Sequence, residues 1–326
     1  MRRVLLLLLF LMLLGPGWSR TERLDLLHAG PAAIRAERVA LDPDDPARRR
    51  LGRLTYLGGV SLDSPDPAFG GFSALHVAGD RFVMLSDGGG VARFRMDGAG
   101  RVSDAHFADL PGGPGGSWDK RDRDAEALAV DPATGRIWVA FERWNAIWRY
   151  APGFARAEGQ VRPAEMAGWS FNGGPESLAR RADGSFVVLS ESHFAADGSG
   201  SSGRVFLGDP VAGARSYGFR LRAPKGWLAS DAAELPDGRL LVLLRRFALA
   251  ERGFANKLLL VERGAIRPGA VVRGRVIATL RRPLIHDNFE GLAISEEQGR
   301  TIVWLLSDDN QLFLQRTLLL KFAFDE

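Results

Sequence analysis

Acidic residues stand at matching places in four short segments of the chain, each ahead of small and aliphatic residues. The segments read RDAEALAVD, GGPESLARR, ASDAAELPD and NFEGLAISE, and a fifth segment, GGFSALHVA, has serine at the same place. Their alignment makes five residues equivalent: Ser73, Glu126, Glu176, Asp231 and Glu290. Carboxylates held close together repel one another, and a hard cation that prefers oxygen ligands, such as Ca²⁺, relieves the repulsion. The acids Glu126, Glu176, Asp231 and Glu290 therefore predict a cation site, if the fold brings them together.

A second use of these acids is open at this point. Each carboxylate could accept backbone N–H bonds from a neighbouring repeat and so lock the repeats together. Amide side chains at Asn145, Asn172, Asn288 and Asn310 lie near the same segments and could add carbonyl ligands to a cation.

A second set of polar residues follows the first by 14 to 18 positions, at the end of the next aliphatic run. It comprises Asp87, Glu142, Glu191, Arg245 and Asp308. Arg245 is the exception among acids, and its planar guanidinium could hold a phosphate or a carboxylate. The alternative for Arg245 is a salt bridge to Glu142 or Glu191.

Two histidines lie close to these sets, His193 shortly after Glu191 and His286 shortly before Glu290. Either could act as a general acid or base, and together with Arg245 they are our predicted catalytic residues. The alternative is that each is a solvated loop histidine.

Short strands must position all of these residues. Five aliphatic and aromatic runs are bounded by Gly, Pro or Asp, and helix-length amphipathic windows are scarce. The runs are RFVMLSD (81–87), RIWVAFER (136–143), SFVVLSE (185–191), RLLVLLRR (239–246) and TIVWLLSDD (301–309). A glycine-containing turn precedes each run, which indicates five similar hairpins and an all-β fold.

The hairpins repeat with intervals of 53, 50, 55 and 59 residues between the aligned positions. A period of that length filled with short strands is typical of a β-propeller with about four strands in each blade. Five repeats are visible, and a sixth blade built from the two ends of the chain is the alternative. The last repeat lacks an outer strand, so we predict that residues 52–62 pair with it and close the ring. Both polar sets then surround one mouth of the axial channel.

The N-terminus has the layout of a secretory signal, with two arginines, an apolar run over 4–14 and then Gly-Pro-Gly. We predict a signal peptide over 1–19, an exposed lead-in over 20–51 and a single propeller domain over 52–326. The protein is then periplasmic or secreted, with an uncleaved N-terminal anchor as the alternative. After cleavage we expect no membrane span, and we expect a monomer.

The composition excludes several classes of protein. Hydrophobic residues make up 46% of the chain, which is enough for a folded core. The formal net charge of +4, about +2 without the signal, is too small to indicate nucleic-acid binding. Cysteine is absent, so there are neither disulfides nor thiolate chemistry. The sequence also has no Gly-x-Ser-x-Gly, His-Glu-x-x-His or Walker motif, and no dinucleotide-binding Gly-x-Gly-x-x-Gly directly after a strand.

The order of the segments GGFSAL, LSDGGG, RDAEALAVD, GGPESLA, NFEGLAIS and LLSDDN resembles the phytase-like family, exported bacterial propellers described as having esterase-like activity. The resemblance runs from Gly52 to Phe324. It implies hydrolysis of esters or phosphoesters with Ca²⁺ as cofactor, and its matching acids are Glu126, Glu176, Glu290, Asp87 and Asp308. Two departures from the family pattern are Ala127 in place of glycine, and Asp231 with Arg245 in the fourth repeat.

These observations predict an exported hydrolase that acts on a small-molecule ester or phosphoester with a divalent cation at the mouth. The alternative is a propeller without catalytic activity that binds an envelope ligand or a partner protein through the same face.

Overall fold

The computed structural model describes residues 32–115, 123–248, 253–312 and 314–325. The signal peptide expected over 1–19 lies outside these residues. Within them, no helix is both long enough and apolar enough to cross a membrane. Three short 3₁₀ turns are the helical elements here: η1 (Pro152–Phe154), η2 (Ala164–Met166) and η3 (Pro210–Ala212).

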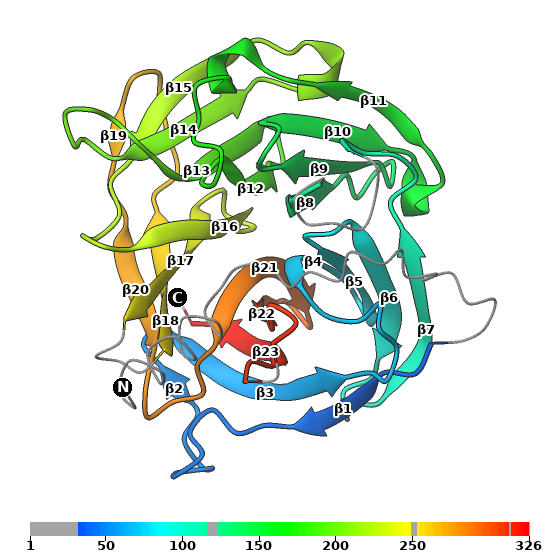
Figure 1. Ribbon diagram of the computed structural model, residues 1–326. Coiled ribbons are helices and arrows are strands. Elements are labelled where there is room, and N and C mark those ends of the chain that lie inside the picture. The colour runs from blue at the N-terminus through cyan, green and yellow to red at the C-terminus, as the bar shows by residue number, and fades with distance from the viewer. Residues whose placement is uncertain (1–31, 116–122, 249–252, 313, 326) are drawn as a thin grey trace, which may run out of the picture.

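The described strands form five sheets arranged around a central axis, which confirms a five-bladed propeller (Figure 1). Blade 1 contains β4 (Phe72–Ala78), β5 (Arg81–Ser86), β6 (Gly90–Met96) and β7 (Val102–Asp109). Blade 2 contains β8 (Ala125–Val130), β9 (Ile137–Phe141), β10 (Ala146–Tyr150) and β11 (Ala157–Val161). Blade 3 contains β12 (Pro175–Arg180), β13 (Phe186–Phe194), β14 (Ser201–Phe206) and β15 (Ser216–Leu221), with β19 (Val271–Val272) added in parallel at its edge. Blade 4 contains β16 (Leu228–Glu234), β17 (Leu240–Ala248), β18 (Gly253–Val261) and β20 (Arg275–Leu280).

Blade 5 joins the two ends of the chain. It contains β21 (Asn288–Glu297), β22 (Arg300–Asp308), β23 (Thr317–Phe324), β3 (Leu54–Asp63) and β1 (Arg35–Arg38), and β2 (Arg50–Leu51) pairs with β3. β3 pairs antiparallel with the whole length of β23, from Thr317 opposite Leu62 to Phe324 opposite Leu54. This pairing confirms the predicted ring closure, because it satisfies the backbone edge that β23 would otherwise expose.

Apolar side chains fill the spaces between neighbouring blades. Trp304 of blade 5 packs edge-on against Phe82 of blade 1, with ring centroids 5.0 Å apart. Trp138 of blade 2 meets Phe186 of blade 3 in the same way at 4.9 Å. Each fully buried aromatic of this kind contributes about 1.5–3 kcal/mol. The blades are thus held rigidly enough to place polar groups at the axis.

The segment that precedes β3 lies against the outside of the ring. Its side chains are mostly exposed, but Leu41 is buried, and the carbonyl of Leu41 accepts a hydrogen bond from Ile285 N at 2.8 Å. β1 adds a further strand to the edge of blade 5.

Candidate functional site

Every inner strand has a β-bulge near its start. In the hairpin formed by the first two strands of each blade, one residue of the first strand has no partner on the second strand. These unpaired residues are Ser73, Glu126, Glu176, Ser230 and Glu290. A bulge places one extra residue outside the regular alternation of side chains and re-aims it. The five bulge residues therefore form one equivalent set around the axis.

The predicted alignment is wrong by one residue in blade 4. Ser230, and not Asp231, holds the bulge position, so the inner set contains three acids and two serines. The carboxylate of Asp231 accepts hydrogen bonds from Ala232 N at 2.8 Å and from Leu292 N of blade 5 at 2.7 Å. Burial raises the pKa of Asp231 well above its usual value, although these N–H donors lower it in part. Asp231 thus holds blade 4 to blade 5 by accepting a backbone N–H bond from the neighbouring blade, which is the alternative role considered for these acids.

The second polar set lies where the repeat predicts. In the five hairpins the residues Ser86, Phe141, Ser190, Leu244 and Ser307 pair with the residue just before each bulge. The next residue in each case belongs to the second set: Asp87, Glu142, Glu191, Arg245 and Asp308. Since both sets flank the same ladder pair, they surround the same mouth of the ring.

Acids from blades 2 and 3 converge into a buried cluster. One group consists of Asp124, Glu126 and Glu142, and a second consists of Glu142, Glu176 and Glu191. In each group the ligand oxygens lie within 4.8 Å of one another. Two oxygens bound to one Ca²⁺ at about 2.4 Å can be at most about 4.8 Å apart, so either group could hold a cation. Glu142 belongs to both groups.

Three members of the cluster were not among the predicted ligands. Glu142 and Glu191 were placed at the mouth, but their contact across the two blades could not be read from a repeat. Asp124 precedes its strand, and its only sequence signal is a second acid two positions before Glu126. It adopts a left-handed backbone conformation, with φ of 52°, and is fully buried.

Two carboxyls of the cluster, Glu142 and Glu176, resist ionisation. Burial raises the pKa of Glu142, and the charge of Glu126 raises it further, while hydrogen bonds with Asp124 and Glu176 lower it in part. Burial and the charges of Glu126 and Glu191 raise the pKa of Glu176 well above its usual value. Carboxyl groups that share a hydrogen bond must share a proton or be neutralised by a cation.

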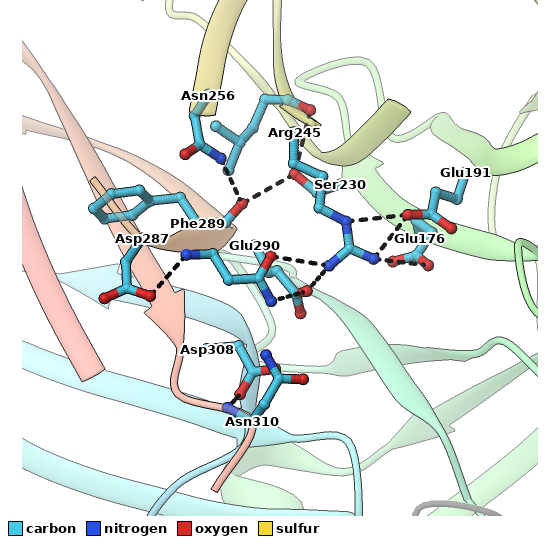
Figure 2. A network of polar contacts seen from close by, with 12 residues as sticks. Glu176, Glu191, Ser230, Arg245, Asn256, Asp287, Phe289, Glu290, Asp308 and Asn310 are labelled. Atoms are coloured by element: carbon cyan, nitrogen blue, oxygen red, sulfur yellow. Dashed lines mark hydrogen bonds and ion pairs between the residues drawn. The ribbon is translucent and has the colours of Figure 1, made fainter. Parts of the chain in front are cut away.

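Arg245 crosses the mouth from blade 4 and meets acids on both sides (Figure 2). Its Nε and Nη2 atoms donate to Glu191 Oε1 at 3.0 and 2.7 Å, and Nη2 lies 3.9 Å from Glu176. On the other side Nη1 forms an ion pair with Glu290 and donates to Asn288 Oδ1 at 3.3 Å. Burial acts to lower the pKa of Arg245, but Glu176 and Glu191 outweigh burial and raise it. The expected alternative of a salt bridge to Glu191 is therefore present.

The remaining predicted residues lie at the mouth but outside both acidic groups. Glu290 is held by Arg245 and by Asn288 Nδ2 at 2.7 Å, and Asp308 accepts a hydrogen bond from Asn310 N at 2.7 Å (Figure 2). Asp87 is half-buried in blade 1 and lies close to Gly71.

The two histidines occupy different settings. His193 is half-buried on a stretch of β13 that bulges away from β14 between Leu189 and Phe194. His286 is also half-buried, and its Nδ1 lies 2.8 Å from the carbonyl of Leu284. That contact makes Nδ1 the protonated nitrogen in the neutral ring, so Nε2 is able to accept a proton.

Several buried oxygens near the acids have no hydrogen-bond partner among the described residues, and two of them bear on a cation. They are Asn145 Oδ1 and the hydroxyl of Ser73, the bulge residue of blade 1. A Cβ atom at Gly174 would lie only 2.6 Å from Asn145 Oδ1 and 2.7 Å from the carbonyl of Glu142. Glycine is therefore required for this close approach, and the lone oxygen of Asn145 suits a hard cation.

The raised pKa values predict how stability without metal changes with pH. The pKa of Glu176 in the folded chain exceeds the ordinary value of 4.5. The contribution of Glu176 to the stability of the folded state is therefore complete below about pH 4.5, and it is lost as the pH rises through the pKa of the folded chain. In EDTA, Glu176→Gln should therefore become more stable than the wild type as the pH rises from about 5 to about 8. Urea unfolding at each pH measures the difference.

Glu165 supplies the control for this experiment, since its backbone and Arg204 lower its pKa. Glu165→Gln should show no such gain. Equal stability of Glu176→Gln and the wild type at every pH would contradict the raised pKa.

Distant structural similarities accompany this fold. Hydrazine synthase of Kuenenia stuttgartiensis is 15% identical, with 90% of this chain and 81% of that chain covered and a TM-score of 0.40. Glutaminyl cyclase of Myxococcus xanthus is 12% identical, with 79% and 92% covered and a TM-score of 0.44. A putative 6-phosphogluconolactonase of Bacteroides fragilis is 10% identical, with 90% and 83% covered and a TM-score of 0.41. At this distance the neighbours say nothing about the chemistry of the mouth.

The sequence itself matches one family. Residues 67–311 match the family described as "Phytase-like: Esterase-like activity of phytase". No curated protein matches the chain. The matched range begins before blade 1 and ends just after β22, so it contains the whole acidic cluster and Arg245.

Proposed function

The chain belongs to the phytase-like family, and from that premise we propose that it is an exported hydrolase of esters or phosphoesters with Ca²⁺ at the mouth. The observation that carries this proposal is the sharing of Glu142 between two groups of buried carboxylates. Without a cation, burial and the neighbouring carboxylates raise the pKa values of Glu142 and Glu176, so that full ionisation of the cluster costs free energy. A bound cation would remove that cost.

The ligands in this proposal come from blades 2 and 3. They are Asp124, Glu126, Glu142, Glu176, Glu191 and the side-chain oxygen of Asn145. Asp231 is not among them, because both of its oxygens accept backbone hydrogen bonds. When bound, Ca²⁺ would polarise an ester or phosphoester oxygen and make it more open to attack by water.

Side chains of the protein would perform the remaining steps. Arg245 would hold an anionic oxygen of the substrate, since its guanidinium offers several donors in one plane. Its present acidic partners keep it aimed at the axis. His286 would accept a proton at Nε2, because Nδ1 is engaged with the carbonyl of Leu284. His193, on the bulged stretch of β13, is the second candidate for this role.

Export is proposed from the sequence alone. The two arginines, the apolar run and the Gly-Pro-Gly that follows favour delivery to the periplasm or the medium.

Thermal unfolding and turnover together test the proposed function. A ligand present at a hundredfold excess over its Kd stabilises the folded state by about 2.7 kcal/mol, so Ca²⁺ should raise the unfolding temperature and EGTA should reverse the rise. Hydrolysis of 4-nitrophenyl acetate and of 4-nitrophenyl phosphate, each with Ca²⁺ and with EGTA, identifies the bond class. Stabilisation by Ca²⁺ without turnover of either compound would favour a propeller that only binds. If neither effect is seen, the cation site is refuted.

A further inference from the structure

Large apolar side chains are exposed around the charged mouth. Of the nine such residues that are exposed in the described parts of the chain, five lie in loops or strand ends on the mouth face. These are Phe171, Phe194, Phe247, Leu312 and Leu314. Single exposed apolar residues are ordinary on a protein surface, but a group that surrounds a polar centre indicates a binding surface.

Two blades extend further over the mouth than the others. In blades 1, 2 and 5 the second strand ends at Ser86, Phe141 and Asp308, level with the second polar set. In blades 3 and 4 it continues to Phe194 and Ala248. The two extended hairpins therefore form a wall beside the acidic cluster, and each carries one phenylalanine that is more than half exposed.

Phe247 stands directly above Arg245 on the wall of blade 4. The β17–β18 ladder is regular here, with Arg245 opposite Asn256 and Phe247 opposite Phe254. Residues two apart in a strand lie on the same face, roughly 7 Å from each other, so Phe247 and Arg245 face the same side. The rings of Phe247 and Phe254 pack edge-on with centroids 5.2 Å apart. On blade 3, Phe194 closes the β13–β14 ladder opposite Ser201.

The guanidinium of Arg245 and the ring of Phe247 thus lie within the span of one small molecule. A small inorganic anion at Arg245 would leave Phe247 and Phe194 in water. A ligand with both an anionic and an apolar part would contact both features and bury the exposed rings.

We propose that the mouth binds an amphiphilic anion, with its charged group at Arg245 and its apolar chain against Phe247, Phe254 and Phe194. This inference rests on the proposed function, and it narrows the substrate class to esters or phosphoesters that carry an apolar chain able to span roughly 7 Å from the anionic group. Esters and phosphoesters without such an apolar chain are then poor ligands.

Binding of alkyl phosphates tests the proposal without requiring turnover. Isothermal titration of the full chain in Ca²⁺ should use methyl, butyl, hexyl and octyl phosphate, each below its micelle concentration. Once the alkyl chain of the ligand reaches the phenylalanine rings, the affinity should rise by up to about fourfold for each added methylene. Phe194→Ala and Phe247→Ala should each flatten this rise and leave the affinity for methyl phosphate unchanged.

Leu207 supplies the matched control. It is 54% exposed, like Phe194, but it follows β14 at the end farthest from the mouth. Leu207→Ala should retain the full dependence on chain length.

The outcomes separate this inference from the proposed function. Equal affinity for methyl and octyl phosphate would overturn the amphiphile proposal, and Ca²⁺-dependent turnover of 4-nitrophenyl acetate would still support the hydrolase. A rise with alkyl chain length that both phenylalanine variants lose, without turnover of 4-nitrophenyl octanoate or of 4-nitrophenyl octyl phosphate, would support the binding surface and refute the hydrolase. Binding to phosphatidylglycerol vesicles but to no monomeric alkyl phosphate would overturn the proposal in favour of a membrane surface.

Discussion

Replacing Arg245 with methionine is expected to destabilise the metal-free protein by about 3–5 kcal/mol, the usual result of leaving buried charges without their partner. The guanidinium side chain is only 20% exposed and contacts Glu176, Glu191 and Glu290. Methionine has a similar length but no charge, so these acids would lose their shared cation. Urea unfolding at neutral pH in EDTA measures the loss.

Two further variants make this result specific. Arg204→Met is the control, because Arg204 is also largely buried at 16% exposure but pairs with a Glu165 that is 46% exposed. It should cost less than about 1 kcal/mol, as exposed ion pairs usually do. The double variant Arg245→Met with Glu191→Gln should recover part of the loss by removing one unpaired acid. A loss for Arg245→Met no larger than that for Arg204→Met would show that the guanidinium does not stabilise the mouth.

Glu142→Gln is expected to affect stability and function in opposite directions. The amide keeps the shape of the carboxyl but removes one charge from a crowded cluster, so the metal-free protein should become more stable. The same change takes one ligand from both carboxylate groups. Ca²⁺ should then no longer raise the unfolding temperature, and Ca²⁺-dependent turnover should fall at least 100-fold, or about 2.7 kcal/mol in the activation barrier.

Glu191→Gln is the graded comparison, because Glu191 belongs to one group only. It should weaken the response to Ca²⁺ without abolishing it. A Glu142→Gln protein that still gains stability from Ca²⁺ as the wild type does would place the cation elsewhere. A variant that lost stability in EDTA would show that the carboxyl of Glu142 has a structural role instead.

The architecture followed from the order of short strands and turns. Short aliphatic runs separated by glycine turns satisfy their backbone hydrogen bonds by pairing into sheets, and five such hairpins at a nearly constant interval indicate a ring. The unpaired edge of the last blade required a strand from elsewhere, and residues 54–63 supply it. These features depend on local pattern and chain length, so they were predictable.

The position of Asp231 shows where a repeat alignment fails. Aligned by residue type, Asp231 matches Glu176 and Glu290, but the ladder places Ser230 at the bulge. A shift of one residue in a strand turns the side chain to another side, and here it turns the carboxylate toward Leu292 of blade 5. The bulge is a property of hydrogen bonds between two strands, and no single segment of sequence shows it.

By itself, the sequence determined an all-β ring with five visible repeats, its closure by an N-terminal strand, and the gathering of acids and one arginine at a single mouth. It left five or six blades open, and the strand pairing of the folded chain sets the number at five. Only the tertiary structure decided which of those acids meet. Glu142 joins acids of two blades, Arg245 reaches Glu191 and Glu290 across the mouth, and Asp231 turns aside. The physical reason is that strand pattern sets the level of a residue in its blade, whereas contact across the axis depends on bulges and on how neighbouring blades pack.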